Sequence, residues 1–360
     1  MARKIRVLII DDSALIRQFL SHLLSRDQNI EVVGVAHDPT GAWRKIETLR
    51  PDVLTLDVEM PHMDGLTFLE KLMAITPMPV LMVSSLTEGG CETALRALEL
   101  GAVDIVTKPK VDICRGMEEL AEELIEKVRA AAVARVLGKV YVATPKTAPI
   151  TPRRALHAAS AMIKTTDIIV AIGSSTGGTE AVKEVLEVLP PNSPPILITQ
   201  HMPERFTKTW ADRMNSLCRI SVKEAEDGDS VLPGHALIAP GNYHMTLERS
   251  GARYLVRVNQ NPSVNRHRPS VDVTFASVAK YAGVNSIGII LTGMGHDGAA
   301  GLLQMKRSGA YTIAQDESTC VVFGMPKEAI QVGAVDVVLP LGDIPNALLR
   351  QLREGGRRAV

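Results

Sequence analysis

The sequence predicts two α/β domains, each built on a doubly wound, mainly parallel sheet, joined by a linker. In both halves of the chain, short β-branched runs alternate with segments whose apolar residues recur at helical spacing. Such alternation is typical of parallel sheets that helices cover on both faces. A stretch with three prolines and no sustained period separates the halves, and 360 residues suffice for two cores.

The first half contains five candidate strands. They are short, apolar and bounded by polar residues, glycine or proline, at 5–10, 30–36, 52–56, 79–84 and 103–107. Between these strands lie segments, such as 13–25 and 92–100, whose apolar residues recur at helical spacing. A last helix is expected at about 116–137.

The second half resumes the alternation after a linker that contains Pro145, Pro149 and Pro152. We therefore expect a first domain at 1–137, a linker at 138–166 and a second domain at 167–360. The expected strands are 167–172, 195–199, 286–291 and 337–339, the expected helices are 179–189, 205–217, 271–281 and 299–307 followed by a C-terminal helix, and a hairpin over 243–258 turns at 250–252.

The composition argues against several classes of function. Lys plus Arg and Asp plus Glu are both 40, so no net charge draws the chain to nucleic acid or to an anionic membrane. No apolar stretch approaches the roughly 20 residues that span a bilayer. The first residues are typical of a strand rather than a signal peptide. Four cysteines without CxxC spacing suit a reducing cytoplasm, which is the expected location.

Polar residues follow four of the five strands of the first domain. Asp11 and Asp12 follow the first strand, Asp57 the third, and Lys108 the fifth, while Ser84 ends the fourth. The carboxyl ends of parallel strands share one edge, where ligands bind. Three carboxylates there repel one another unless a cation such as Mg²⁺ lies among them. A lysine and a hydroxyl group beside these carboxylates are suited to bind the oxygens of a phosphoryl group through hydrogen bonds. The alternative, that the acids merely cap helices, fits five polar residues at four matching strand ends poorly.

These residues lie in motifs that resemble the response-regulator receiver domain, over residues 4–121: DDS, LDVEMPHMDG and TKP. The resemblance implies that Asp57 is the phosphoacceptor, and that Asp11, Asp12 and Asp57 hold Mg²⁺. It also implies that Ser84 and Lys108 read the phosphoryl group and that a histidine kinase is the phosphodonor.

A second set of polar residues follows strands of the other domain. The motif GSSTGG, residues 173–178, forms a tight turn between a strand and a helix, and such a turn exposes a side chain or aims N–H groups at an anion. It matches neither the dinucleotide nor the P-loop pattern. A nucleophilic serine and a structural or phosphate-binding turn both remain open from this motif alone.

His201 and Asp297 favour the nucleophile. Each follows a predicted strand, so both share the sheet edge with the serines. Nucleophile, base and orienting acid then lie together. The chain order Ser…His…Asp is acceptable, because triads are defined by geometry and not by order.

Five motifs, GSSTGG, TQHMP, IAPGNYHM, HRPSVD and LTGMGHDG, together resemble the protein-glutamate methylesterase domain of bacterial chemotaxis, over about 163–355. The resemblance implies a Rossmann-like, three-layer hydrolase. Ser175 is then the nucleophile, His201 the general base and Asp297 the residue that orients it. The N–H of Met294 and the loop around Thr176 bind the oxyanion.

One departure from the family pattern lies beside the nucleophile. Relatives commonly have alanine where this chain has Ser174. We favour Ser175 because it directly precedes Thr-Gly-Gly, as in the family.

The two resemblances together imply a phosphorylation-activated hydrolase. It demethylates glutamate methyl esters on the cytoplasmic helices of chemoreceptors, releases methanol and deamidates specific glutamines, with Mg²⁺ in the receiver and no cofactor in the catalytic domain. Two alternatives are a receiver joined to a non-catalytic phosphate- or nucleotide-binding module, and a transcription factor. Neutral charge and the lack of a basic recognition helix count against the latter.

Two further features bear on substrate and control. The basic run Arg266, His267 and Arg268 either steers an acidic receptor segment or forms a solvated loop. Ile105 stands three positions before Lys108, where many receivers carry an aromatic switch residue, so an apolar relay replaces the aromatic flip. We expect the receiver to cover the active-site edge until Asp57 is phosphorylated.

Overall fold

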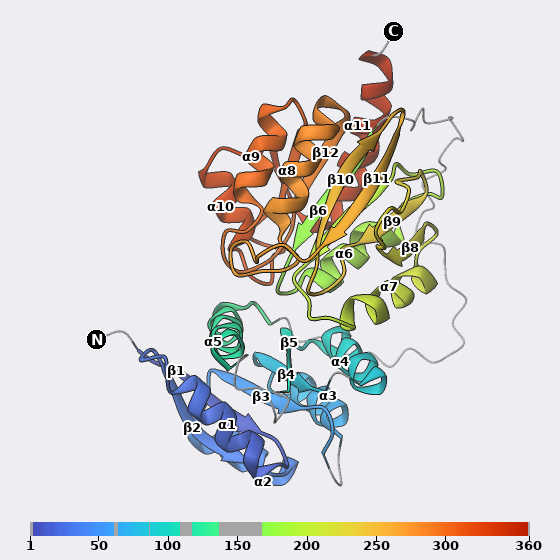
Figure 1. Ribbon diagram of the computed structural model, residues 1–360. Helices are drawn as coiled ribbons and strands as arrows, with labels where there is room; N and C mark the ends of the chain where they lie inside the picture. Colours follow the sequence, from blue (N-terminus) through green and yellow to red (C-terminus); the bar gives the residue numbers. More distant parts are fainter. Residues whose placement is uncertain (1–2, 61–63, 86, 109–116, 137–167, 359–360) are drawn as a thin grey trace, which may run out of the picture.

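The computed structural model describes residues 3–60, 64–85, 87–108, 117–136 and 168–358, and it confirms the α/β fold class (Figure 1). The expected linker at 138–166 lies outside the described residues, so the domain boundaries stay a prediction.

The N-terminal domain is a five-stranded parallel sheet in the order β2-β1-β3-β4-β5. Buried β-branched and leucine side chains fill its strands, and helices lie on both faces (Figure 1). The strands are β1 (Ile5–Ile10), β2 (Ile30–Ala36), β3 (Val53–Asp57), β4 (Val80–Ser84) and β5 (Asp104–Thr107), and the helices are α1 (Ala14–Leu24), α2 (Pro39–Leu49), α3 (Gly65–Ile75), α4 (Glu88–Leu100) and α5 (Met117–Val133).

The C-terminal domain is a seven-stranded parallel sheet in the order β14-β13-β12-β6-β7-β9-β8. Its strands are β6 (Ile169–Ser174), β7 (Ile196–Gln200), β8 (Ser221–Glu224), β9 (His235–Ile238), β12 (Ser286–Ile290), β13 (Tyr311–Gln315) and β14 (Val337–Leu339). The hairpin is β10 (His244–Ser250) with β11 (Arg253–Asn259), and the helices are α6 (Gly178–Glu187), α7 (Phe206–Leu217), α8 (Val271–Tyr281), α9 (Ala299–Arg307), α10 (Met325–Gln331) and α11 (Ile344–Arg358).

The sequence did not predict every element of this second domain. Strands β8, β9 and β13 and helix α10 were not foreseen. Both β8 and β9 are only four residues long, and β8 lies at the sheet edge with its first residue exposed. A strand this short and this polar has too few apolar residues to show a period.

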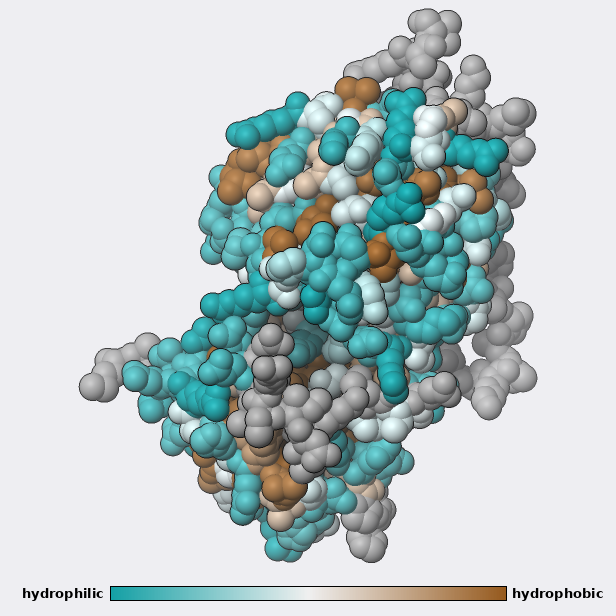
Figure 2. Space-filling model, in the orientation of Figure 1, coloured by the Kyte–Doolittle hydropathy of each residue, from teal (hydrophilic) through white to brown (hydrophobic). Residues whose placement is uncertain are grey.

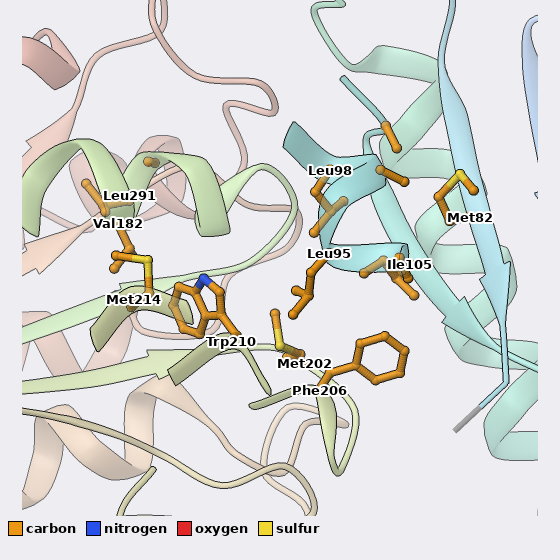
Figure 3. Packing of buried hydrophobic residues seen from close by; sticks show 14 of the residues in the cluster. Met82, Leu95, Leu98, Ile105, Val182, Met202, Phe206, Trp210, Met214 and Leu291 are labelled. Atoms are coloured by element: carbon orange, nitrogen blue, oxygen red, sulfur yellow. The ribbon is translucent and has the colours of Figure 1, made fainter. Parts of the chain in front are cut away.

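The two domains pack through one shared apolar cluster. Figure 3 shows Leu95 of α4 facing Met202 and Trp210 of the C-terminal domain, with Ile105 of β5 behind it. Polar contacts surround the cluster. The guanidinium of Arg213 in α7 pairs with both carboxylate oxygens of Glu99 in α4, one of them at 2.8 Å. This interface places α4, β5 and α5 of the receiver-like domain beside the C-terminal domain.

The chain after α5 also contacts the C-terminal domain. The backbone N–H of Arg135 donates to the carbonyl of Val321 at 2.9 Å, and its side chain donates to the carbonyl of Glu317 at 3.1 Å. The visible face of the molecule is mainly hydrophilic, with hydrophobic residues scattered over it (Figure 2). Among the described residues, no helix is both long and apolar enough to cross a membrane.

Candidate active site

Three adjacent parallel strands bring the predicted catalytic residues to one edge of the sheet. Ser175 directly follows β6 and His201 directly follows β7, and the neighbouring β12 leads through a glycine-rich loop to Asp297. Ser174 and Gln200 are paired in the register of β6 and β7, so the next residue of each strand emerges side by side.

Asp297 lies at the N-terminus of α8, and five donors converge on its carboxylate. Oδ2 accepts hydrogen bonds from the backbone N–H of Val271, at 2.6 Å, and from Nε2 of His201, at 2.8 Å. Oδ1 accepts from Ser270 Oγ and Asn265 Nδ2, both at 2.7 Å, and from the backbone N–H of residue 272 at 3.2 Å. The carboxylate thus caps the first turn of a helix whose N-cap serine is turned toward it.

These donors decide the protonation state of Asp297. Burial acts to raise the pKa of this carboxyl, but the hydrogen bonds from His201, Asn265 and Ser270 outweigh burial and hold its pKa well below the usual range. Asp297 is therefore an anion at neutral pH, although it is only 2% exposed.

The ring of His201 is oriented by this anion. Because Nε2 faces the carboxylate, the neutral ring carries its proton on Nε2, and Nδ1 has the lone pair. Nδ1 is buried and has no hydrogen-bond partner among the described residues. The geometry thus assigns Nδ1 as the nitrogen that is available to a nucleophile.

The two adjacent serines occupy different environments. Ser174 is fully buried, and its hydroxyl donates to Oε1 of Gln200 at 2.6 Å. Nε2 of Gln200 in turn donates to the carbonyl of Ser175 at 2.8 Å. Ser175 is half-buried and lines the same cavity as His201. Ser174 is therefore part of the support, and Ser175 is the serine that a substrate can reach.

Two backbone N–H groups lie free beside Ser175. Among the described residues, no acceptor contacts the N–H of Thr176 or of Met294. Gly293 packs so closely that a Cβ there would lie 2.7 Å from Cβ of Ser175, which brings the Met294 peptide next to the nucleophile. The Thr176 hydroxyl donates across the domain interface to Oδ2 of Asp104 at 2.7 Å.

A cavity of about 560 Å³ lies between the domains. The C-terminal domain contributes Ser175, His201 and Met294 to its lining. The N-terminal domain contributes Asp104 and one face of α5: Leu120, Glu122, Glu123, Glu126, Lys127 and Ala130. The N-terminal domain therefore lies across the opening of the candidate active site.

The basic run of the sequence splits into three separate roles. The side chain of Arg268 donates to Oδ1 of Asn242 at 2.7 Å, so it holds the loop. His267 stacks on His201. Arg266 is exposed, and its guanidinium lies 3.8 Å from the carboxylate of Glu122 in α5. Only Arg266 of the three is placed to steer an acidic partner.

His201, His267 and Asp297 lie close enough to hold a metal ion, but their orientations do not suit one. The imidazole lone pairs lie in the ring planes, and the two rings are parallel within 7°. Their lone pairs cannot converge on one ion between them. The carboxylate oxygens of Asp297 already accept five hydrogen bonds. This cluster fits proton transfer better than metal binding.

The receiver-like domain gathers the predicted acidic residues at the ends of β1 and β3. Carboxylate oxygens of Asp11, Asp12 and Asp57 lie within 4.8 Å of one another. Nζ of Lys108 lies 2.6 Å from Oδ2 of Asp57 and 3.5 Å from Oδ2 of Asp11. Ser84 is also buried here, but its hydroxyl donates to the carbonyl of Gly90 in α4 at 2.9 Å. Three hard oxygen donors with two buried carboxylates fit Mg²⁺.

The pKa values of this acidic cluster show why a cation is suited to it. Burial raises the pKa of Asp57 to about 6, against the ion pair with Lys108, and the charge of Asp11 adds to the rise. Burial likewise raises the pKa of Asp11. One lysine is thus too little positive charge to hold both buried carboxylates at their ordinary pKa.

Comparison with known proteins identifies the family. Residues 170–348 match the family model described as CheB methylesterase, and residues 7–118 match the response regulator receiver domain. A Geobacter metallireducens relative, named protein-glutamate methylesterase/protein-glutamine glutaminase 1, is 60% identical over 355 residues, which cover 99% of this chain and 98% of that relative. The chain belongs to the CheB methylesterase family.

Two more similarities support this membership. A Thiobacillus denitrificans protein-glutamate methylesterase/protein-glutamine glutaminase is 56% identical, over 99% of both chains. The solved catalytic domain of the Thermotoga maritima CheB methylesterase is 43% identical, with a TM-score of 0.50, and covers 51% of this chain and 98% of that domain. The resemblance drawn from the motifs is thereby confirmed.

Some residues of the site were missed by the sequence reading. Asn265 and Ser270 contact Asp297 directly, and they lie in or beside the motif HRPSVD, which was noted without roles. A serine two residues before an aspartate at a predicted helix start was the available signal. Asp104 and Glu126 reach the site from the other domain, and no local pattern could place them there.

The first prediction separates the two serines. Ser175→Ala abolishes ester hydrolysis, because it removes the hydroxyl that directly follows β6 at the sheet edge shared with His201. Ser174→Ala retains most activity but lowers stability by about 1–3 kcal/mol, because Oε1 of Gln200 loses its buried donor. Methanol release and thermal unfolding of both variants measure this. A folded Ser174→Ala protein without activity would contradict the assignment.

The second prediction concerns Asp297. Asp297→Asn lowers kcat, but less than loss of Ser175 or His201, because Asp297 orients the base without touching substrate. Its amide also places N–H groups against N–H donors, so stability falls. Asp336→Asn is the matched control, since Asp336 accepts hydrogen bonds from Thr312 far from the cavity. An Asp297→Asn enzyme of undiminished kcat would remove Asp297 from the triad.

Proposed function

We propose that this chain is a phosphorylation-regulated hydrolase that removes methyl groups from glutamate methyl esters of chemoreceptors and deamidates glutamines. The observation that carries the proposal is the ordered set Ser175, His201 and Asp297 at neighbouring strand ends, in a chain whose relatives bear those two activities in their names. A receiver joined to a non-catalytic binding module has no support from these relatives.

The proposed reaction begins with proton transfer. Nδ1 of His201 takes the proton of the Ser175 hydroxyl as Oγ attacks the ester carbonyl, and Asp297 stabilises the resulting imidazolium. The N–H groups of Thr176 and Met294 receive the negative charge of the tetrahedral oxygen; loss of one such donor costs about 3–4 kcal/mol. The imidazolium returns the proton to the departing methoxide, and methanol leaves an acyl-enzyme.

Water completes the cycle by the same steps. His201 takes a proton from water as its oxygen attacks the acyl-enzyme, and Ser175 leaves with a proton from the imidazolium. The product is a free glutamate side chain. A glutamine amide follows the same route with ammonia as the leaving group, so a single site serves both activities.

The receiver is proposed to control this site. Asp57 accepts the phosphoryl group from a histidine kinase of a chemotaxis-type pathway, and Asp11, Asp12 and Asp57 hold the Mg²⁺ that supplies the charge for the transfer. Ser84 and Lys108 then bind the phosphoryl oxygens. We place the protein in the cytoplasm, where it meets the cytoplasmic helices of methylated receptors, with its domains divided at 1–137, 138–166 and 167–360.

The route from Asp57 to the active site follows two elements. The hydroxyl of Ser84 is bonded to the start of α4, and Lys108 follows β5, which carries Asp104. Both α4 and β5 contact the catalytic domain (Figure 1). A turn of Ser84 toward a phosphoryl group breaks its bond to Gly90 and releases α4 from its present position. Because Ile105 lies in the shared apolar cluster, its repacking takes the place of an aromatic flip.

The proposed activity is tested with purified protein and methyl-labelled receptor membranes. Full-length protein with Mg²⁺ and a small phosphodonor releases methanol faster than without the donor. Ser175→Ala removes all release, and Asp57→Ala removes only the response to the donor. Equal release by Ser175→Ala and wild type would refute the proposed hydrolysis.

The third prediction concerns pH and Mg²⁺. The folded-state pKa of Asp57 lies above that of the unfolded chain, so stability from Asp57 is present at low pH and is lost as pH rises through about 6, a loss of about 3 kcal/mol at most. Millimolar Mg²⁺ reverses this loss, so it raises Tm more at pH 7.5 than at pH 5. Asp57→Asn removes most of that difference, whereas the exposed control Glu70→Gln keeps it. A pH-independent Mg²⁺ effect would contradict the site.

The fourth prediction concerns the interface. Arg213→Ala in the unphosphorylated full chain breaks the two-point ion pair with Glu99 and raises basal hydrolysis about tenfold, which corresponds to about 1.4 kcal/mol. Arg219→Ala, an exposed arginine of the same domain, leaves it unchanged. A fragment from about Ser160 to Val360 hydrolyses ester faster than either full-length variant, and its rate does not respond to phosphodonors. A fragment no faster than the unphosphorylated whole would exclude occlusion.

A further inference from the structure

His267 forms the closest ring contact of the candidate site. Its imidazole lies face to face with that of His201, with ring centroids 3.7 Å apart and planes parallel within 7°. The hydrogen bond to Asp297 holds only one edge of the His201 ring. A ring held at one edge still tilts about that bond, so its faces need packing partners to fix the direction of Nδ1.

The ring of His267 is itself held by Asn265, a residue that also contacts Asp297. Its Nδ1 lies 2.7 Å from the carbonyl oxygen of Asn265, so this nitrogen carries the proton and donates it. The side-chain amide of Asn265 donates to Asp297 and to Asp272, both at 2.7 Å. One residue therefore holds both the anion at the edge of His201 and the ring on its face.

The loop that carries these contacts is tightly folded. Backbone hydrogen bonds join Val264 and His267 in both directions, at 3.1 and 2.9 Å. Asn265 and Arg266 between them have φ values of 52° and 66°, in the left-handed region that non-glycine residues seldom adopt. Positive φ at both central residues is the geometry of a type I′ turn, which favours asparagine, and from this turn the side chain of Asn265 reaches Asp297.

The charge state of His267 suits this place. Burial and the neighbouring His201 lower the pKa of His267 to about 3, so the ring is neutral when the enzyme works. The charge of Asp297 acts to raise the pKa of His267, and the charge of Lys127 acts to lower it. Two arginines flank His267 in its own loop, and three acidic residues of α5, Glu122, Glu123 and Glu126, line the same cavity. A neutral ring face attracts an adjacent cation, whereas a second charged ring would repel the His201 imidazolium.

We infer that His267 is a positioning residue for catalysis: its ring face sets the plane of His201 so that Nδ1 points at Ser175. This inference rests on the proposed function. If His267 only stabilised the loop, its hydrogen bond to Asn265 would matter and its ring would not. The hydrogen bond and the ring can therefore be tested separately.

Two substitutions separate the effect of the hydrogen bond from that of the ring. His267→Phe keeps a flat ring without the donor, and His267→Asn keeps a donor near the position of Nδ1 without the ring. His267→Ala removes both. His235→Asn is the matched control, because His235 makes the same kind of Nδ1 contact, to the carbonyl of Pro233 at 2.9 Å, away from the cavity.

The experiment measures kcat and KM for methanol release from methylated receptor by the phosphodonor-activated full chain, with thermal unfolding of each variant. His267→Asn and His267→Ala lose about 10²-fold in kcat with KM unchanged, as expected of a misdirected base. His267→Phe retains most of kcat even where its Tm falls.

The opposite pattern would overturn the inference. If His267→Asn is active and His267→Phe is not, the residue serves the loop and not the base. If all three variants keep kcat, the ring is dispensable. Should His267→Ala fail to fold, the Phe and Asn variants still decide. An inactive wild-type protein would instead overturn the proposed function, and the inference with it.

Discussion

The buried carboxylate of Asp297 at the first turn of α8 is the interaction on which the rest of the site depends. A buried anion is costly unless donors surround it, and here a helix N-terminus, a serine, an asparagine and His201 all donate to it. The same hydrogen bonds that lower its pKa also fix the tautomer of His201 and anchor the loop that carries His267. The same contacts therefore stabilise the buried charge and fix the geometry of the site.

The second constraint is the way in which one domain is placed against the other. The receiver presents α4, β5 and α5 to the catalytic domain, and Ser84 is bonded to α4 while Lys108 follows β5. Its α5 lines the active-site cavity. A change at the acidic cluster thus has a short mechanical route to the interface, which consists of an apolar cluster with a few ion pairs around it (Figure 3).

Most of the fold, and the grouping of the candidate catalytic residues, could be predicted because both follow from local patterns. Strand ends in a parallel sheet share an edge, so Ser175, His201 and Asp297 were placed together without any structure. The short strand β8 escaped because it has no apolar period. The hydrogen bond from Thr176 to Asp104 could not be predicted for another reason. It joins residues 72 positions apart on different domains, and a sequence pattern carries no information about how two surfaces meet.

The size of the interdomain cavity determines what the receiver excludes. A space of about 560 Å³ accommodates a small organic ester, while an α-helix, about 10 Å across with its side chains, cannot enter without moving α5. In this closed arrangement Asp297 and His201 are already bonded, while Nδ1 of His201 has no hydrogen-bond partner among the described residues. The lining by α5 therefore limits molecular size in this arrangement: a small ester fits beside Ser175 and His201, and a protein helix does not.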